Sequence, residues 1–157
     1  MPFANNLQAL VDEAFRGKSF TEIAKAPIGV LGGINHTDGQ KLMEALDVKT
    51  IAELAANRYV LWAQAIHNLA PYDRADVMTV RLATLIDPKI ETKRLRELVR
   101  MSPAAFVGLS EKKAKMLEEA AQIRTIEDLA TNRFVLVSQV IAHLARQEKL
   151  EGFKQAA

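Results

Sequence analysis

The sequence predicts an all-α fold, built as a tandem duplication of a five-helix unit. The first observation is an internal period: sliding the chain against itself by 75 positions aligns Gly39–Ala70 with Ala114–Ala145 without a gap. A fixed period indicates one structural unit used twice. The second is that apolar residues recur at helical spacing, with no alternation typical of a β-strand. We therefore expect two repeats, residues 1–75 and 76–157, packed as one globule.

Each repeat is predicted to open with an amphipathic helix. Apolar residues follow the i, i+3, i+4 pattern that places them on one helix face. In the first repeat they are Leu7, Leu10, Val11, Ala14 and Phe15, and in the second Met78, Leu82, Leu85 and Ile86.

Three shorter helices are expected next in each repeat. In the first repeat the second helix begins after Ser19, with Glu22 completing a capping box. In the second repeat it is expected over residues 92–100. A tight connection over residues 29–39 or 105–114 leads to a helix that ends near Leu46 or Ala121.

The fourth helices begin after Thr50 and Thr125, whose hydroxyls can cap an amide three residues on. Glu53 is expected to complete a capping box better than the shorter Asp128.

The longest helices are expected to follow Asn57 and Asn132 as N-caps and to end near Ala70 and Leu150. They are apolar on most sides, so we expect each to be the buried centre on which its own repeat packs. Gln64 and Gln139, equivalent and inside these helices, should bond a nearby loop carbonyl or amide. We expect Arg58 and Arg133 to pair with an acidic side chain or a helix C-terminus. Three aromatic residues are expected in the core or, alternatively, at an interface: Tyr59, Trp62 and Tyr72.

Composition is that of a soluble globular protein, with 49% hydrophobic and 25% charged residues in 157. The absence of cysteine excludes disulfides, thiolate metal sites and a cysteine nucleophile. No secretory signal or membrane span is visible, so a cytoplasmic location and no membrane contact are expected. His36, His67 and His143 are not equivalent between repeats, and no metalloprotease, P-loop or nucleophile-elbow motif occurs. We expect a non-enzyme with no catalytic residue, metal or cofactor.

Charge is distributed unevenly between the repeats. Residues 1–75 hold 7 Lys and Arg against 8 Asp and Glu, and residues 76–157 hold 14 against 11, giving net charges of −1 and +3. The basic excess lies between Lys89 and Lys115, so an anionic partner would bind the second repeat.

The connection before the third helix resembles the helix-hairpin-helix family and its wider SAM-like helical relatives. In the second repeat it reads VGLSEKKAKML over Val107–Leu117, followed by TIEDL over Thr125–Leu129. The first repeat reads GGINHTDGQKL over Gly32–Leu42, followed by TIAEL over Thr50–Leu54. The resemblance covers about the central 30 residues of each repeat.

The resemblance implies nucleic-acid backbone binding at the start of the third helix, where free amides attract a phosphate. Asn35 and Ser110 replace the family's second hairpin glycine, and as N-caps their side chains would occupy those amides. Asp38 would repel a phosphate in the first repeat, whereas lysines would attract one in the second. The candidate residues, including one basic face of the second short helix, are Gly108, Ser110, Lys112, Lys113, Lys115, Lys93, Arg96 and Arg100.

The leading hypothesis for function is a helical binding or scaffolding module that engages a protein partner or itself. Low net charge and two altered hairpins favour it. The alternative is DNA or RNA backbone binding through the basic second repeat.

Overall fold

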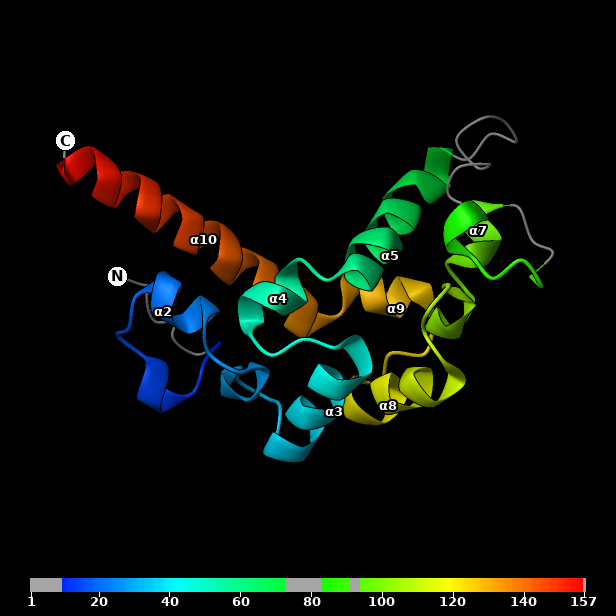
Figure 1. Cartoon of the computed structure of the whole chain (residues 1–157), viewed down its shortest axis with the longest axis horizontal. Helices are drawn as coiled ribbons and strands as arrows, with labels where there is room; N and C mark the ends of the chain where they lie inside the picture. Colours follow the sequence, from blue (N-terminus) through cyan, green and yellow to red (C-terminus); the bar gives the residue numbers. More distant parts are fainter. Residues whose placement is uncertain (1–9, 73–82, 91–93, 157) are drawn as a thin grey trace. The chain divides into compact units, whose positions relative to one another are not determined.

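The computed structural model describes residues 10–72, 83–90 and 94–156, and within them the fold is all-α (Figure 1). These residues form α-helices and single 3-10 turns, with no β-strand. Two isolated antiparallel bridges join Val11 to Leu31 and Ile86 to Phe106. The all-α prediction is confirmed.

Eight α-helices lie in the described part of the chain. Their bounds are α2 (Phe20–Ala24), α3 (His36–Leu46), α4 (Ile51–Ala55), α5 (Arg58–Leu69), α7 (Leu95–Leu98), α8 (Glu111–Ala121), α9 (Ile126–Thr131) and α10 (Arg133–Ala156). The 3-10 turns are η1 (Glu13–Phe15), η2 (Ile28–Val30), η3 (Ala70–Tyr72), η4 (Ala83–Leu85) and η5 (Pro103–Ala105).

The described parts of the predicted opening helices are not α-helical. Around Val11, the Asp12 N–H donates to the Val30 carbonyl and the Gly32 N–H to the Leu10 carbonyl, both at 2.7 Å. The backbone therefore pairs with a distant segment instead of with its own next turn. Within the described part of the predicted helix, η1 is the helical element.

The second repeat shows the same departure from the predicted opening helix. The Val107 N–H donates to the Leu85 carbonyl at 2.9 Å, and the Asp87 N–H to the Ala105 carbonyl at 2.8 Å. Leu7, Met78 and Leu82, which belonged to these predictions, lie outside the described residues.

Side-chain caps define most of the remaining helix starts. Ser19, Thr50 and Thr125 each accept the amide three residues on, as predicted. The relative quality of the two capping boxes was predicted wrongly. Asp128 accepts the Thr125 N–H and completes its box, whereas the Glu53 carboxylate accepts the N–H of Lys49.

The chain divides into two compact units that do not follow the sequence repeats. The first unit combines the chain up to Ala56 with the chain from Arg133 onward, and the second is Asn57–Asn132. One unit is therefore inserted within the sequence of the other. The compact units differ from the ranges 1–75 and 76–157 that the internal period suggested.

In the first unit, α10 lies along α2 and α4, and α3 packs on η2 (Figure 1). The N-terminal elements are thus covered by the last helix of the chain. The buried side chains of this unit include Ile23, Ile28, Leu31, Leu42, Leu46, Ile51, Leu54, Val135 and Ile141.

In the second unit, α5 packs on α9 and α7, and α8 packs on η5. The ring of Trp62 lies 5.4 Å from that of Tyr59 and 5.8 Å from that of Phe106, centre to centre. Tyr59 and Phe106 are buried and Trp62 is half-buried, so these aromatic residues form part of the core. Tyr72, by contrast, is exposed.

The two long helices are exchanged between the repeats. We expected α5 and α10 each to support its own repeat, and this was wrong: α5 contacts α7 and α9, and α10 contacts α2 and α4. The predicted glutamine bonds to backbone groups are present and cross between repeats too, but their acceptors lie in α9 and α4 and not in loops. Gln64 Nε2 donates to the Ala130 carbonyl and Gln139 Nε2 to the Ala55 carbonyl, both at 3.2 Å.

The C-terminal part of α10 is fixed to the start of α2 by Glu148. Its carboxylate accepts the N–H groups of Phe20 and Thr21 at 2.9 and 2.8 Å, and the Thr21 hydroxyl at 3.0 Å. Burial alone would raise the pKa of Glu148, but these hydrogen bonds outweigh it and lower the pKa below its ordinary value.

Candidate functional site

The connection before α8, residues 107–110, is called here the hairpin of the second unit, and it places Ser110 at the start of α8. Its Oγ accepts the N–H of Lys113 at 3.2 Å, so the predicted cap is present. This hydroxyl occupies an amide that a phosphate at the helix start would use. Asn35 does the same in the first unit, where its Oδ1 accepts the Asp38 N–H at 2.7 Å.

Gly108 lies against the side chains that open α5. Its φ is +93°, and a Cβ built there would come within 2.6 Å of the Tyr59 hydroxyl and 3.4 Å of an Arg58 nitrogen. The glycine is therefore required both by the backbone conformation and by the close approach of Tyr59.

Sequence analysis missed Arg58 as a residue of this hairpin. Its guanidinium donates to the Tyr59 hydroxyl at 2.7 Å and lies over the rings of Tyr59 and Trp62, 4.7 and 5.8 Å from their centres. The predicted acidic or helix C-terminal partner was wrong. No local signal could have revealed this position, because it follows from the exchange of long helices.

Arg133 repeats this arrangement in the first unit. Its Nη2 donates to the Gly32 carbonyl at 3.1 Å, and a Cβ on Gly33 would come within 3.0 Å of the guanidinium. Each long helix thus begins with an arginine placed at the hairpin of the other repeat.

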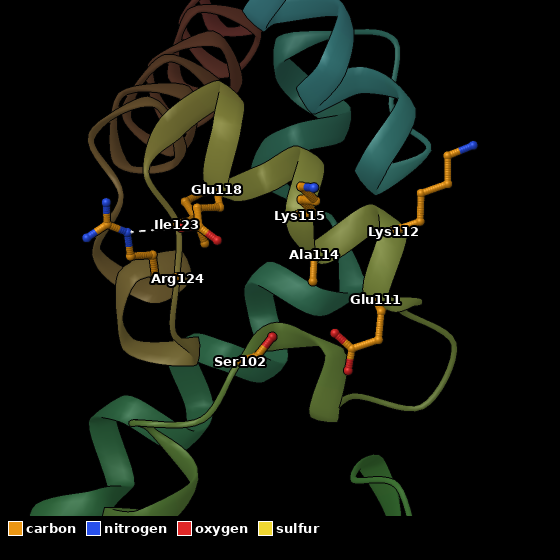
Figure 2. A pocket seen from close by; sticks show the side chains of 8 residues that line it. All are labelled: Ser102, Glu111, Lys112, Ala114, Lys115, Glu118, Ile123 and Arg124. Atoms are coloured by element: carbon orange, nitrogen blue, oxygen red, sulfur yellow. Dashed lines mark ion pairs between the residues drawn. The ribbon is translucent and has the colours of Figure 1, made fainter.

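Two of the three predicted lysines of α8, Lys112 and Lys115, line a shallow hollow of about 540 Å³ (Figure 2). Lys112 and Lys115 are exposed and Lys113 is half-buried. The positive charges that line the hollow are balanced in part by Glu111 and Glu118. The Nε of Arg124 lies 3.4 Å from the Oε1 of Glu118. In Figure 2 the Lys112 side chain extends away from Glu111 and Ser102. The lining is Ser102, Glu111, Lys112, Ala114, Lys115, Glu118, Ile123 and Arg124.

Of the predicted basic face of the second short helix, the structure describes Arg96 and Arg100. Arg96 lies 3.4 Å from the carbonyl oxygens of Ala70 and Pro71, to which it donates, so it holds the end of α5. Arg100 is exposed beyond the end of α7, and Lys93 lies outside the described residues.

A second hollow, of about 440 Å³, lies beside the hairpin of Gly108. Its lining is largely apolar, with Asp87 as the carboxylate. A carboxylate at this position would repel a phosphate on that side of the hairpin. The lining residues are Asp87, Pro88, Ala104, Phe106, Val107, Gly108, Leu109 and Ser110.

The helix α10, which the sequence analysis expected to be buried on most sides, carries an exposed stripe with three apolar residues. Leu136, Val140 and Leu150 are 45%, 43% and 53% exposed, and the exposed His143 and Gln147 lie between them. We call these five residues the outer stripe. Their spacing of 4, 3, 4 and 3 places them on one helix face. The opposite face, Val135, Ser138, Ile141 and Ala145, is buried.

The helix α5 exposes one apolar residue equivalent to the start of the outer stripe. Leu61 corresponds to Leu136 and is 47% exposed. Ala65 stands where α10 has Val140, and α5 ends at Leu69. An exposed apolar stripe of several turns is therefore a feature of α10 and not of α5.

Neither a metal cluster nor a membrane span is found in the part of the chain that the structure describes. No group of three or more His, Asp or Glu side chains is placed to hold a metal ion there. No helix among those residues is long and apolar enough to cross a membrane.

Comparison of the chain with protein-family models, with curated proteins and with solved structures gives no match.

Proposed function

We propose that this chain is a non-enzymatic helical module for protein association, and that the outer stripe of α10 is its contact surface. The supporting observation is that three apolar side chains on one face of a single helix are about half exposed. Exposed apolar side chains gathered on one face, with polar residues among them, are a feature of protein interaction sites. The opposite face of α10 holds its own unit together, so a partner could bind without unfolding the protein.

We further propose that the module arose as a tandem duplication. The bounds of α3 and α8 differ by 75 residues at both ends, and the bridges Val11–Leu31 and Ile86–Phe106 are related by the same shift. The two copies have diverged in their last helices. The 24 residues of α10 against the 12 of α5 account for the longer exposed stripe on α10.

The association is tested by placing a photo-crosslinking amino acid at position 140 of the full chain, in cells that produce it. We expect a defined adduct at this position and not at position 115, which is exposed on α8. The partner captured in the adduct is then purified separately, and its binding to the chain without the photo-crosslinking amino acid is measured. Binding should survive moderate salt and be lost in Val140→Glu; no adduct above the level at position 115 would refute the proposal.

A second candidate function, nucleic-acid backbone binding at the hairpin of the second unit, is favoured by the position of Arg58. The guanidinium adds a cation beside Gly108 that the sequence analysis did not count. Phosphate binding would weaken steeply with salt.

This second candidate is tested by fluorescence anisotropy of labelled single- and double-stranded DNA and RNA at low and physiological salt. It requires salt-sensitive binding that disappears in the Lys112→Glu, Lys113→Glu double variant. Absence of binding even at low salt would exclude it.

A further inference from the structure

The outer stripe has the residue pattern of a coiled-coil seam. Its spacing assigns Val140 and Gln147 to a positions of a heptad, and Leu136, His143 and Leu150 to d positions. All five side chains are exposed. From this pattern we propose that α10 pairs with α10 of a second copy of this chain, parallel and in register. The inference rests on the proposed function and names the partner.

The residue types at the seam favour two parallel strands. A β-branched residue at a with leucine at d is the combination typical of parallel dimers, and Val140 and Leu136 provide it. A polar residue at an a position fixes the register at some cost in stability. Gln147 fits that role, because in register it would face Gln147 of the second copy.

The charges beside the seam identify a second copy as the occupant. Arg146 lies at a g position and Glu151 at the following e position, and both side chains are exposed. In a parallel pair, g of one helix faces the next e of the other, so Arg146 would meet Glu151 of the second copy, twice by symmetry. An antiparallel pair would place e against e, which leaves Glu151 beside the apolar e positions Val137 or Leu144.

The geometry of α10 within its unit permits this pairing. The helix is already formed and its b, c and f face is packed on α2 and α4, so association needs no helix formation. The seam covers residues 136–150, about 22 Å of helix at 1.5 Å per residue. A contact this short is smaller than a standard stable interface, so we expect a dissociation constant on the order of 10–100 μM.

The dimer is tested by analytical ultracentrifugation of the full chain at concentrations from about 5 to 500 μM, which span the expected constant. We expect the average mass to rise from monomer toward dimer, and to stay that of a monomer in Val140→Glu. Leu61→Glu, a change of the same kind at the exposed apolar position of α5, should dimerise like the wild type. If Val140→Glu loses its helical circular dichroism, Leu150→Glu replaces it.

The parallel register is tested by exchanging charges. Arg146→Glu and Glu151→Arg should each weaken the dimer about three- to tenfold, and the double variant should restore it. His143→Leu, which places leucine at a d position, should strengthen the dimer about tenfold.

Three outcomes would overturn the inference: a monomer at every concentration, a dimer indifferent to Val140→Glu, or a double charge variant no better than the single ones. A monomeric chain that still forms its adduct at position 140 with a different protein would overturn self-pairing alone. Loss of both the dimer and the adduct would remove the proposed function as well.

Discussion

At the scale of single residues, two glycines at positions that are not equivalent separate backbone strain from steric exclusion. Gly17 and Gly108 both have positive φ, +87° and +93°. A Cβ on Gly17 would meet nothing within 4 Å, whereas one on Gly108 would collide with the Tyr59 hydroxyl. The two positions therefore share the conformational demand and differ in the space around them.

Gly108→Ala is expected to destabilise the protein more than Gly17→Ala. The left-handed conformation should cost about 1 kcal/mol at either site, and displacement of Tyr59 should raise the cost at Gly108 to about 2–4 kcal/mol. Urea unfolding followed by Trp62 fluorescence measures the difference, since Trp62 is the single tryptophan and contacts Tyr59. Equal costs at the two sites would contradict the packing described for Gly108.

Ser138 and Ala63, its equivalent in α5, form a matched pair. Both are fully buried, and the Ser138 hydroxyl has no hydrogen-bond partner among the described residues. A buried unsatisfied hydroxyl costs about 1–3 kcal/mol. Ser138→Ala should therefore stabilise the protein by about 1 kcal/mol in chemical denaturation, and Ala63→Ser should destabilise it. Destabilisation by Ser138→Ala would show that the hydroxyl does find a partner.

At the scale of elements, acid should loosen α10 from α2. The pKa of Glu148 is lowered in the folded protein, so its stabilising effect is present above the ordinary glutamate pKa of 4.5 and is lost as the pH falls through the folded value. Glu148→Gln should lower the free energy of unfolding at pH 7 by about 1 kcal/mol and flatten its fall below pH 4.5. Glu44→Gln, on the exposed side of α3, is the control. An unchanged acid profile in Glu148→Gln would contradict this role.

Elements whose ends are set locally could be predicted from sequence. Asn35, Ser110, Thr50 and Thr125 cap helices as expected because each acts on an amide only three residues away. The described end of the first opening helix could not be predicted, since around Val11 the backbone pairs with a segment about 20 residues distant despite the helical spacing. Hydrophobic spacing reports burial, and a buried residue such as Val11 can satisfy it without a helix.

The candidate surface escaped sequence analysis for a related reason. Leu136, Val140 and Leu150 are apolar, and an apolar helix is ordinarily assigned to the core. Their exposure depends on which elements cover α10, and hydrophobic patterning alone does not show which elements do so. Arg58 was missed because its contact with Gly108 joins parts of the chain 50 residues apart.

At the scale of the whole molecule, the exchange of long helices makes each unit depend on both repeats. The sequence could not show this, because α4 and α9 are nearly alike and offer α5 equivalent surfaces: Ala55 and Ala130 present the same carbonyl. The structure resolves the choice in favour of the other repeat in both cases.

Separate fragments of residues 1–75 and 76–157 are therefore expected to complement each other. A mixture should form a 1:1 complex with the circular dichroism of the intact chain, and Gln64→Ala in one fragment with Gln139→Ala in the other should weaken it at least tenfold. Native mass spectrometry gives the stoichiometry. Two stable, separate monomers would contradict the exchange.

The nesting of the second unit within the first also sets the order in which a ribosome can complete them. Every residue of Asn57–Asn132 has been synthesised before the first residue of α10. An N-terminal segment ordinarily folds first, but here α2 and α4 cannot complete their packing until α10 has been made. Their apolar faces stay uncovered during that time. At about 5–20 residues per second, the 24 residues of α10 extend that wait by seconds. Chaperones should therefore be needed during synthesis for the segment that contains α2 and α4, until α10 has been made.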